Sequence, residues 1–392
     1  MGNFRLLLFV VCLFILTSGN GSPGYEKIVT GASQPENYLH LLKAKRVGLV
    51  VNQTSCIGDT HLVDFLKKEN IDIRKIFAPE HGFRGDSSAG EEVESGVDVK
   101  TGIAIISIYG KNKKPSAESL ADIDVMVFDV QDVGCRFFTY ISTLHYVIEA
   151  CAENNVPLIV LDRPNPNGDY VDGPVLKKEF RSFVGMDPIP VVHGCTIGEL
   201  AQMINGEMWH NAEKRCNLTV IPVIGYNHTM RYSLPVKPSP NLPNDLSVRL
   251  YPSLCFFEAT SVSIGRGTVF PFQVIGYPDK RFGSFSFTPE SIPGVAAHPV
   301  QEGVVCYGED LRLAGEPPGF TFSFFLKYYK KFKNEAEFLA RERWFNLLAG
   351  DDKVLKLIRE GKNDQEIKFS FEDELKAYKK IRKKYLLYTD FE

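Results

Sequence analysis

Short apolar runs alternate with amphipathic segments through the first 235 residues of this 392-residue chain. The segments between the runs carry apolar residues at helical spacing, as in 60–70, 140–155 and 196–206. Alternation of this kind is typical of strand–helix–strand units, which build a parallel sheet covered by helices on both faces. The pattern therefore predicts an α/β fold. The runs expected to form strands are 47–51, 73–78, 103–109, 125–130, 157–162 and 218–224.

The pattern changes beyond Pro235, where a proline-rich loop precedes a stretch dense in Gly and Phe and then several helical segments. We therefore expect two domains, a first over 25–235 and a smaller α+β domain over 236–392. Two domains also fit a chain of this length at about 100–200 residues per domain. The basic segment KAYKKIRKKYLLY (376–388) predicts an amphipathic helix that docks through Tyr and Leu and keeps its charges in solvent.

The N-terminal residues have the pattern of a secretory signal peptide. Arg5 precedes an apolar stretch from Leu6 to Leu16, and small residues follow around Gly19 and Gly21. A bilayer span takes about 20 apolar residues, so this stretch is too short to anchor the chain. We expect 1–21 to be removed and the mature protein to be exported to the periplasm or the extracellular space, without stable membrane insertion.

Charge and cysteine content disfavour a nucleic-acid-binding protein, a zinc protein and a disulfide-rich scaffold. A formal net charge of −3 gives no reason to expect a nucleic-acid partner. Cys12 lies in the expected signal peptide, and the seven other cysteines lack the paired spacing of zinc sites and of dense disulfide scaffolds. Because seven is an odd number, at least one thiol is free or pairs between chains, and the sequence leaves the oligomeric state open.

Polar side chains follow five of the predicted strands. In an open α/β sheet, ligands bind at the carboxyl ends of the strands, so these residues are expected to converge on a pocket rich in hydrogen bonds. The stretch FAPEHGFRG (77–85) is the most unusual, because a simple turn does not need Glu80, His81 and Arg84. The strand-end residues are Asn52, Gln53, Thr54, Glu80, His81, Tyr109, Lys111, Asp129, Gln131, Asp132, Asp162, Arg163 and Asn165.

Motifs for several other ligands are absent from the sequence. No Gly-x-Gly-x-x-Gly follows the first strand, no P-loop ends in Lys-Ser/Thr, and no Gly-x-Ser-x-Gly elbow occurs. Possible metal ligands occur without the short paired spacing of a zinc protease motif. We therefore expect no cofactor and no catalytic metal. The possible ligands are His81, Asp129, Asp132, Asp162 and His193.

Carboxylates, amides and arginines interleaved with aromatic residues suit a polyhydroxylated substrate. Glycoside hydrolysis needs two carboxyl groups, one to protonate the leaving oxygen and one to activate water or attack the sugar. Glu80 is the first candidate for one of them. The alternative is that Glu80 and Arg84 form an ion pair one helical turn apart, which contributes only a few tenths of a kcal/mol.

Seven long segments, in order along the chain, carry a family resemblance. They are FAPEHGFRG (77–85), FDVQDVGCRFFTYISTL (128–144), VLDRPNPNG (160–168), DGPVL (172–176), VHGCTIGELAQMING (192–206), PSPNLPN (238–244) and FFEATSVSIGRGTVFPFQVIGYP (256–278). The mature chain resembles the NamZ-type exo-β-N-acetylmuramidases, formerly a domain family of unknown function. The resemblance implies a Rossmann-like first domain, a smaller second domain, and an active-site cleft between them.

The implied activity is release of N-acetylmuramic acid from the non-reducing end of peptidoglycan-derived saccharides. The resemblance places the leading catalytic glutamate at Glu80, next to His81. It leaves three candidates for the second carboxylate, Asp172, Glu199 and Glu258. The alternative from another class is a non-catalytic cell-wall sugar-binding protein.

The lactyl carboxylate of muramic acid suggests a binding role for the arginines, because a planar guanidinium can bind a carboxylate through two hydrogen bonds. Arg136 follows a strand-end turn, and Arg266 lies between two glycines, so we expect one of them to bind it. The full set of expected substrate-binding residues is Arg84, Asp129, Gln131, Asp132, Arg136, Tyr140, Asp162, Arg163, Asn165, His193, Asn241 and Arg266.

Overall fold

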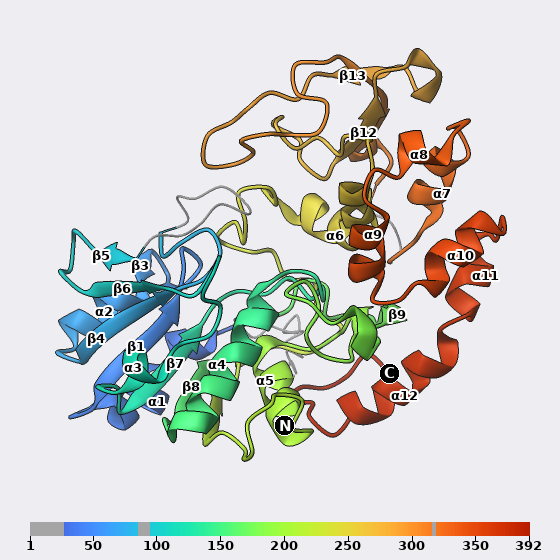
Figure 1. The fold of residues 1–392 in the computed structure, drawn as a ribbon. Coiled ribbons are helices and arrows are strands. Elements are labelled where there is room, and N and C mark those ends of the chain that lie inside the picture. The colour runs from blue at the N-terminus through green and yellow to red at the C-terminus, as the bar shows by residue number, and fades with distance from the viewer. Residues whose placement is uncertain (1–26, 85–94, 316–318) are drawn as a thin grey trace, which may run out of the picture.

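The computed structural model describes residues 27–84, 95–315 and 319–392 (Figure 1). Its helices are α1 (Pro35–Leu42), α2 (Leu62–Lys68), α3 (Ala117–Leu120), α4 (Tyr140–Asn154), α5 (Ile197–Gly206), α6 (Asp245–Leu254), α7 (Ser323–Tyr329), α8 (Glu335–Phe338), α9 (Glu342–Ala349), α10 (Lys353–Arg359), α11 (Asp364–Phe369) and α12 (Glu372–Arg382). Its strands are β1 (Arg46–Val51), β2 (Cys56–Ile57), β3 (Thr60–His61), β4 (Asp72–Ala78), β5 (Gly96–Val97), β6 (Ala104–Ser107), β7 (Val125–Asp129), β8 (Leu158–Leu161), β9 (Asp172–Val175), β10 (Pro190–Val192), β11 (Leu218–Ile221), β12 (Val274–Tyr277), β13 (Phe285–Phe287) and β14 (Cys306–Asp310).

The central sheet has the strand order β11-β8-β7-β1-β4-β6-β5, and all its pairs are parallel except β5 with β6. From β1 the chain builds outward through β4 and β6, then crosses to the other side of β1 and builds through β7, β8 and β11. This is the doubly wound order of Rossmann-like folds, whose ligand crevice lies where the building direction reverses. The α/β prediction is confirmed, and each of the six predicted apolar runs overlaps one of these parallel strands.

Alternate side chains of the central strands enter two separate cores. Val47, Leu49 and Val51 of β1 pack into a core with α1 and α2, whereas Val50 faces the opposite core, which contains α4 and α5. Successive side chains of a strand point to opposite faces of the sheet. Because both faces are covered by helices, the strands appear in the sequence as continuous apolar runs, without alternation of apolar and polar residues.

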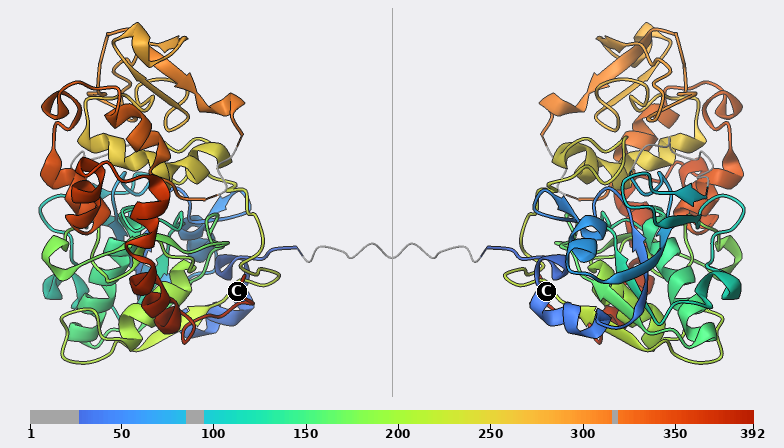
Figure 2. Two further views of the ribbon diagram at one scale, coloured as in Figure 1. Left: turned by 90° about the vertical axis from the view of Figure 1, so that its right-hand side faces the viewer. Right: turned by 90° about the vertical axis from the view of Figure 1, so that its left-hand side faces the viewer.

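The second half of the chain forms a three-stranded antiparallel sheet, β12-β14-β13, together with α6 to α11 (Figures 1 and 2). The larger of the two cores continues from α4 and α5 into this part, where Phe256, Phe257, Phe325 and Phe345 form a cluster of tilted rings. One apolar core therefore fixes the second part against the carboxyl ends of the parallel strands.

Helix α12 runs from the second part back to the first (Figure 2). The Tyr378 hydroxyl donates to the His193 carbonyl at 2.7 Å, and the guanidinium of Arg382 donates to the Gly194 carbonyl. Docking through tyrosine was predicted from the sequence. The prediction that the charges of this helix lie in solvent is wrong for Arg382, whose side chain is 1% exposed and paired with Asp390.

The cysteines from Cys56 to Cys306 are all free thiols. Within the described ranges, no helix has the length and apolar character needed to cross a membrane. The predicted signal peptide, 1–21, lies outside the described residues.

Candidate active site

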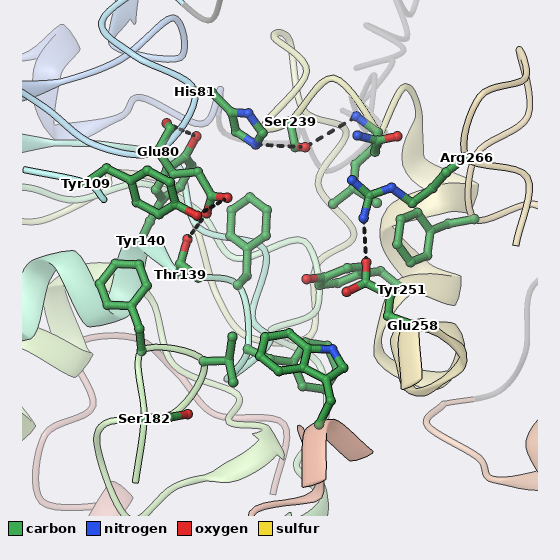
Figure 3. A pocket seen from close by; sticks show the side chains of 18 of the residues that line it. Glu80, His81, Tyr109, Thr139, Tyr140, Ser182, Ser239, Tyr251, Glu258 and Arg266 are labelled. Atoms are coloured by element: carbon green, nitrogen blue, oxygen red, sulfur yellow. Dashed lines mark hydrogen bonds and ion pairs between the residues drawn. The ribbon is translucent and has the colours of Figure 1, made fainter. Parts of the chain in front are cut away.

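A cavity of about 400 Å³ opens where the strand-end loops of the first part meet the second part (Figure 3). Its lining combines two carboxylates, three basic side chains and several aromatic rings. The lining residues are Glu80, His81, Tyr109, Lys113, Phe137, Phe138, Thr139, Tyr140, Ser182, Phe183, Val184, Ser239, Asn241, Leu242, Tyr251, Glu258, Arg266, Phe272 and Trp344.

Glu80 is presented by a tight turn directly after β4. The Gly82 amide donates to the Pro79 carbonyl at 3.0 Å, and both His81 (φ 68°) and Gly82 (φ 77°) have left-handed backbone conformations. A non-glycine residue rarely adopts positive φ, and backbone strain of this kind clusters at functional sites. The strained turn after β4 places the Glu80 side chain in the lining of the cavity.

Two hydroxyls from the connections after β6 and β7 hold the Glu80 carboxylate. Tyr109, after β6, donates to Oε1 at 2.8 Å, and Thr139, after β7, donates to Oε2 at 2.5 Å. Thr139 precedes α4 without capping it through its side chain, so the partial positive charge of the helix N-terminus lies next to the carboxylate. Burial, together with the charge of Glu80, raises the pKa of Tyr109 and of Tyr140, which keeps both phenols protonated and able to donate.

The opposite side of the cavity carries Glu258 and Arg266 (Figure 3). Glu258 lies in a 3-10 turn, Cys255–Ala259, and Arg266 lies in a loop between Gly265 and Gly267, both with φ of 79°. Nη1 of Arg266 donates to Oε1 of Glu258 at 2.8 Å, and both side chains keep about a quarter of their surface exposed (26% and 20%). The cavity thus has one carboxylate on each side.

The loop 238–241 links the two sides. The Oγ of Ser239 lies 3.3 Å from Nε2 of His81, and Nδ2 of Asn241 donates to the Val295 carbonyl at 2.8 Å. Three buried atoms of the lining have no hydrogen-bond partner among the described residues: Oδ1 of Asn241, Oγ of Ser182 and Nε1 of Trp344. A buried polar atom without a partner costs free energy, so these atoms are suited to bind a polar ligand.

Seven of the residues expected from the sequence line this cavity. They are Glu80, His81, Tyr109, Tyr140, Asn241, Glu258 and Arg266. The structure places the remaining expected residues elsewhere, in contacts that hold the fold together.

Asp129 and Arg163 pair with each other below the surface. Nε of Arg163 donates to Oδ1 of Asp129 at 2.6 Å and Nη2 to Oδ2 at 2.9 Å, and both side chains are buried. Arg84 pairs with Asp98 at 3.0 Å and stacks over Phe83. The described residues 80–84 form turns and bends and no helical turn, and Arg84 pairs with Asp98, so the structure does not support the alternative of a helical ion pair between Glu80 and Arg84.

Asp162 and Glu199 belong to a buried network around the start of α5. The Asp162 carboxylate accepts from the Gly198 amide (2.7 Å), the Thr196 hydroxyl (2.8 Å) and the Tyr388 hydroxyl (2.5 Å). Its burial raises its pKa to about 6. Glu199 completes the capping box of α5 with Thr196 and lies 3.0 Å from the His228 ring, so it is a structural carboxylate.

Arg136 is wholly buried and outside the cavity, which contradicts its expected role as a substrate ligand. Its guanidinium donates to the carbonyls of Pro174, Ile189 and Leu348. These bonds join β9 and β10 to the end of α9. Arg136 therefore stabilises the contact between the two parts of the chain.

The remaining expected residues also make structural contacts. Asp132 accepts from the Gly134 amide at 2.6 Å and lies 3.3 Å from the ring of His193. Gln131 donates to the carbonyls of Asp132 and Pro164, and Asn165 donates to the Cys195 carbonyl. Asp172 pairs with Lys368 at 2.7 Å.

The sequence reasoning did not single out several lining residues with polar or aromatic side chains. Thr139 carried a signal, since it lies in the segment 128–144. The segment 182–184 and Trp344 carried none, because they reach the cavity through tertiary packing. The residues missed are Lys113, Thr139, Ser182, Phe183, Ser239, Tyr251, Phe272 and Trp344. No three His, Cys, Asp or Glu side chains converge as metal ligands within the described parts of the chain.

A Rossmann-like sheet with a strand-end pocket is typical of an α/β enzyme, and two carboxylates on facing sides of that pocket are the groups that glycoside hydrolysis needs. The sequence models of the N-terminal and C-terminal parts of exo-β-N-acetylmuramidase NamZ match residues 47–246 and 249–388. The chain belongs to this family of glycosidases.

Known proteins are similar to this chain in sequence and structure over nearly its whole length. The peptidoglycan β-N-acetylmuramidase NamZ of Bacillus subtilis (strain 168) is 38% identical, over 98% of this chain and 99% of its own. Two crystal structures of DUF1343 family proteins from Bacteroides fragilis NCTC 9343 superpose with TM-scores of 0.85 and 0.77, at 42% and 30% identity. They cover 93% and 92% of this chain and 99% of each neighbour.

Proposed function

We propose that the pocket of Figure 3 is where this exo-β-N-acetylmuramidase binds the terminal N-acetylmuramic acid of a peptidoglycan fragment and hydrolyses its glycosidic bond. One observation carries the assignment: the Glu80 carboxylate, on a strained turn, is held in the pocket by the hydroxyls of Tyr109 and Thr139. A catalytic group must be fixed against the reacting bond before the substrate arrives. Glu80 acts directly on that bond.

Glu258 is the second carboxylate of this proposal. Of the three candidates from the sequence, Asp172 is paired with Lys368 and Glu199 is buried in the α5 cap, whereas Glu258 lines the pocket. Arg266 fixes the Glu258 side chain through the bond at 2.8 Å. The pair Glu80 and Glu258 supplies the two carboxyl groups that glycoside hydrolysis requires.

The rest of the lining suits a sugar. A volume of about 400 Å³ is within the usual range for a small-molecule site. Apolar faces of a sugar ring can pack on aromatic side chains such as Tyr251 and Trp344, while its hydroxyl and acetamido groups can bond Asn241 Oδ1 and Ser182 Oγ. These contacts satisfy atoms that have no partner within the described chain.

The location of the enzyme is part of the proposal. The charged, apolar and small segments of 1–21 support export and removal of a signal peptide. N-terminal sequencing of protein recovered from the periplasm or the medium should find a start near residue 20–22. Recovery of full-length chain in the cytoplasm alone would contradict export.

The function is tested with the purified mature chain, a chromogenic β-N-acetylmuramide, and a disaccharide with N-acetylmuramic acid at its non-reducing end. We expect chromophore release and free N-acetylmuramic acid. A disaccharide with the sugars in the opposite order should stay intact, since the enzyme acts on terminal muramic acid. Binding of both disaccharides without any release would instead identify a sugar-binding protein.

A further inference from the structure

The proposed substrate is itself an anion, and the pocket already holds the carboxylates Glu80 and Glu258. A third negative charge, the lactyl carboxylate of muramic acid, needs a cation nearby. Two basic side chains with a permanent charge line the cavity, Lys113 and Arg266. The question is which of them faces the substrate's carboxylate.

Arg266 already has an acidic partner. Its Nη1 bonds Glu258 at 2.8 Å, and the pair lies on the side of the cavity opposite Glu80 (Figure 3). Binding of a second carboxylate there would compete with Glu258 for the same guanidinium. The charge of Arg266 is therefore already paired with the carboxylate of Glu258.

Lys113 has no carboxylate partner among the described residues. Its Nζ donates to the Gly110 carbonyl at 2.8 Å and lies 5.3 Å from the centre of the Phe183 ring. The adjacent Lys114 differs, because it pairs with Glu149 at 2.8 Å and with Glu153 at 3.0 Å. Two successive lysines of one loop thus have different functions: Lys114 anchors the loop to α4, and Lys113 presents its charge to the cavity.

The loop also links Lys113 to the catalytic carboxylate. Tyr109 begins this loop and bonds Glu80, and its ring lies 5.8 Å from the Phe183 ring over which Lys113 extends. The position of the ammonium relative to Glu80 is therefore set by a continuous chain of contacts. A charge-assisted hydrogen bond beside an aromatic wall is stronger than one in bulk water.

We propose that Lys113 binds the lactyl carboxylate and is the residue that distinguishes N-acetylmuramic acid from N-acetylglucosamine. This inference rests on the proposed function, because it assigns the orientation of the terminal sugar in the same pocket. The 3-O-lactyl group is directed to the loop after β6, and the anomeric carbon lies between Glu80 and Glu258.

The experiment compares kcat/KM for a chromogenic β-N-acetylmuramide and the matching β-N-acetylglucosaminide in the parent and in Lys113→Met. Loss of a charged hydrogen bond is expected to lower kcat/KM for the muramide by about 10–150-fold. The glucosaminide lacks the lactyl group, so its rate should change little. Lys113→Arg should retain most of the discrimination. Lys111→Met is the matched control, since Lys111 is exposed on the same loop and does not line the cavity.

A binding measurement makes the inference independent of turnover. Calorimetric titration of free N-acetylmuramic acid and N-acetylglucosamine into parent and Lys113→Met should show the same loss of preference as a ratio of Kd values. An unchanged ratio in folded Lys113→Met would overturn the inference and leave the glycosidase assignment intact. Collapse of the ratio in Arg266→Met alone would assign the carboxylate to Arg266. A parent chain that binds both sugars with the expected preference but hydrolyses neither would refute the proposed function and not Lys113.

Discussion

Two groups of polar side chains lie at the same edge of one parallel sheet, and only the first of them lines the cavity of Figure 3. The first group, Glu80, Tyr109 and Thr139, follows β4, β6 and β7 and faces the cavity. The second group, centred on Asp129, Asp162 and Arg163, lies at the ends of β7 and β8 and is buried. Glu80 of the first group looks like the second group in the sequence, as an ionisable residue close to the end of an apolar run.

The difference comes from what covers each group. The C-terminal residues after α12 pack over the second group: the Tyr388 hydroxyl donates to Asp162, and the Leu387 amide donates to Glu199 at 2.8 Å. Over the first group stand the Glu258–Arg266 pair and the loop 238–241, with a cavity between. A position at a strand end makes a residue a candidate ligand, but the packing of distant chain decides whether it meets substrate.

The largest expected effect is loss of activity on substitution of Glu80, in the first group. Glu80→Gln keeps the size of the side chain and removes the carboxyl group, so kcat/KM on the muramide should fall by about 10²–10⁴. Its unfolding free energy should change by only about 1–2 kcal/mol, the scale of one or two hydrogen bonds. Steady-state kinetics and urea unfolding measure both. A folded variant with more than a tenth of parental activity would show that Glu80 is not the reacting group.

Substitution in the second group should lower the free energy of unfolding and leave activity nearly unchanged. Arg163→Met leaves the buried Asp129 carboxylate unpaired, and breaking such a pair costs about 3–5 kcal/mol of unfolding free energy. Removing both charges in Arg163→Met/Asp129→Leu should recover part of this loss. The folded fraction of the single variant should keep kcat/KM within a few-fold of the parent. A large drop in kcat/KM with unchanged stability would place Arg163 in the active site after all.

The pH dependence of folding sharpens the comparison further. Burial raises the pKa of Asp162 to about 6 from 3.8, so the folded state binds this proton more tightly than the unfolded state. The stabilisation is fully present below pH 3.8 and is lost as the pH rises through 6, about 3 kcal/mol in all at 1.36 kcal/mol per pKa unit. Asp162→Asn should remove this slope.

Urea unfolding of the parent and of Asp162→Asn between pH 4 and pH 7 measures that effect as a difference between the two proteins. Asp373→Asn is the control, since the Asp373 side chain is 99% exposed and should show no such difference. Parallel stability curves for the parent and Asp162→Asn would mean that Asp162 titrates as an ordinary surface carboxyl group.

The smallest expected effect concerns metal. Exhaustive chelation should leave activity unchanged, because the residues at the strand ends lack the spacing of metal ligands and pair with other side chains where the structure describes them. Hydrolysis of the muramide is measured before and after chelation. Loss of activity that one added divalent ion restores would contradict this prediction.

The sequence by itself determined the parallel strands and the helices between them, because burial on both faces leaves a local signature of short apolar runs. It also indicated Glu80, since an acid, an imidazole and glycines after a strand are chemistry that a turn alone does not need. Asn241, Glu258 and Arg266, all in the cavity lining, came from family motifs and not from periodicity.

Only the tertiary structure decided which charges line the cavity. Arg136 and Asp162 lie in motifs as prominent as that of Glu80, yet one bonds three carbonyls and the other bonds Tyr388, which is 226 residues away in the chain. Lys113 and Lys114 are adjacent in the sequence and differ in partner for the same reason. The free energy of a charge depends on its neighbours in space and on its exposure to water, and the residues that supply both lie far away along the chain.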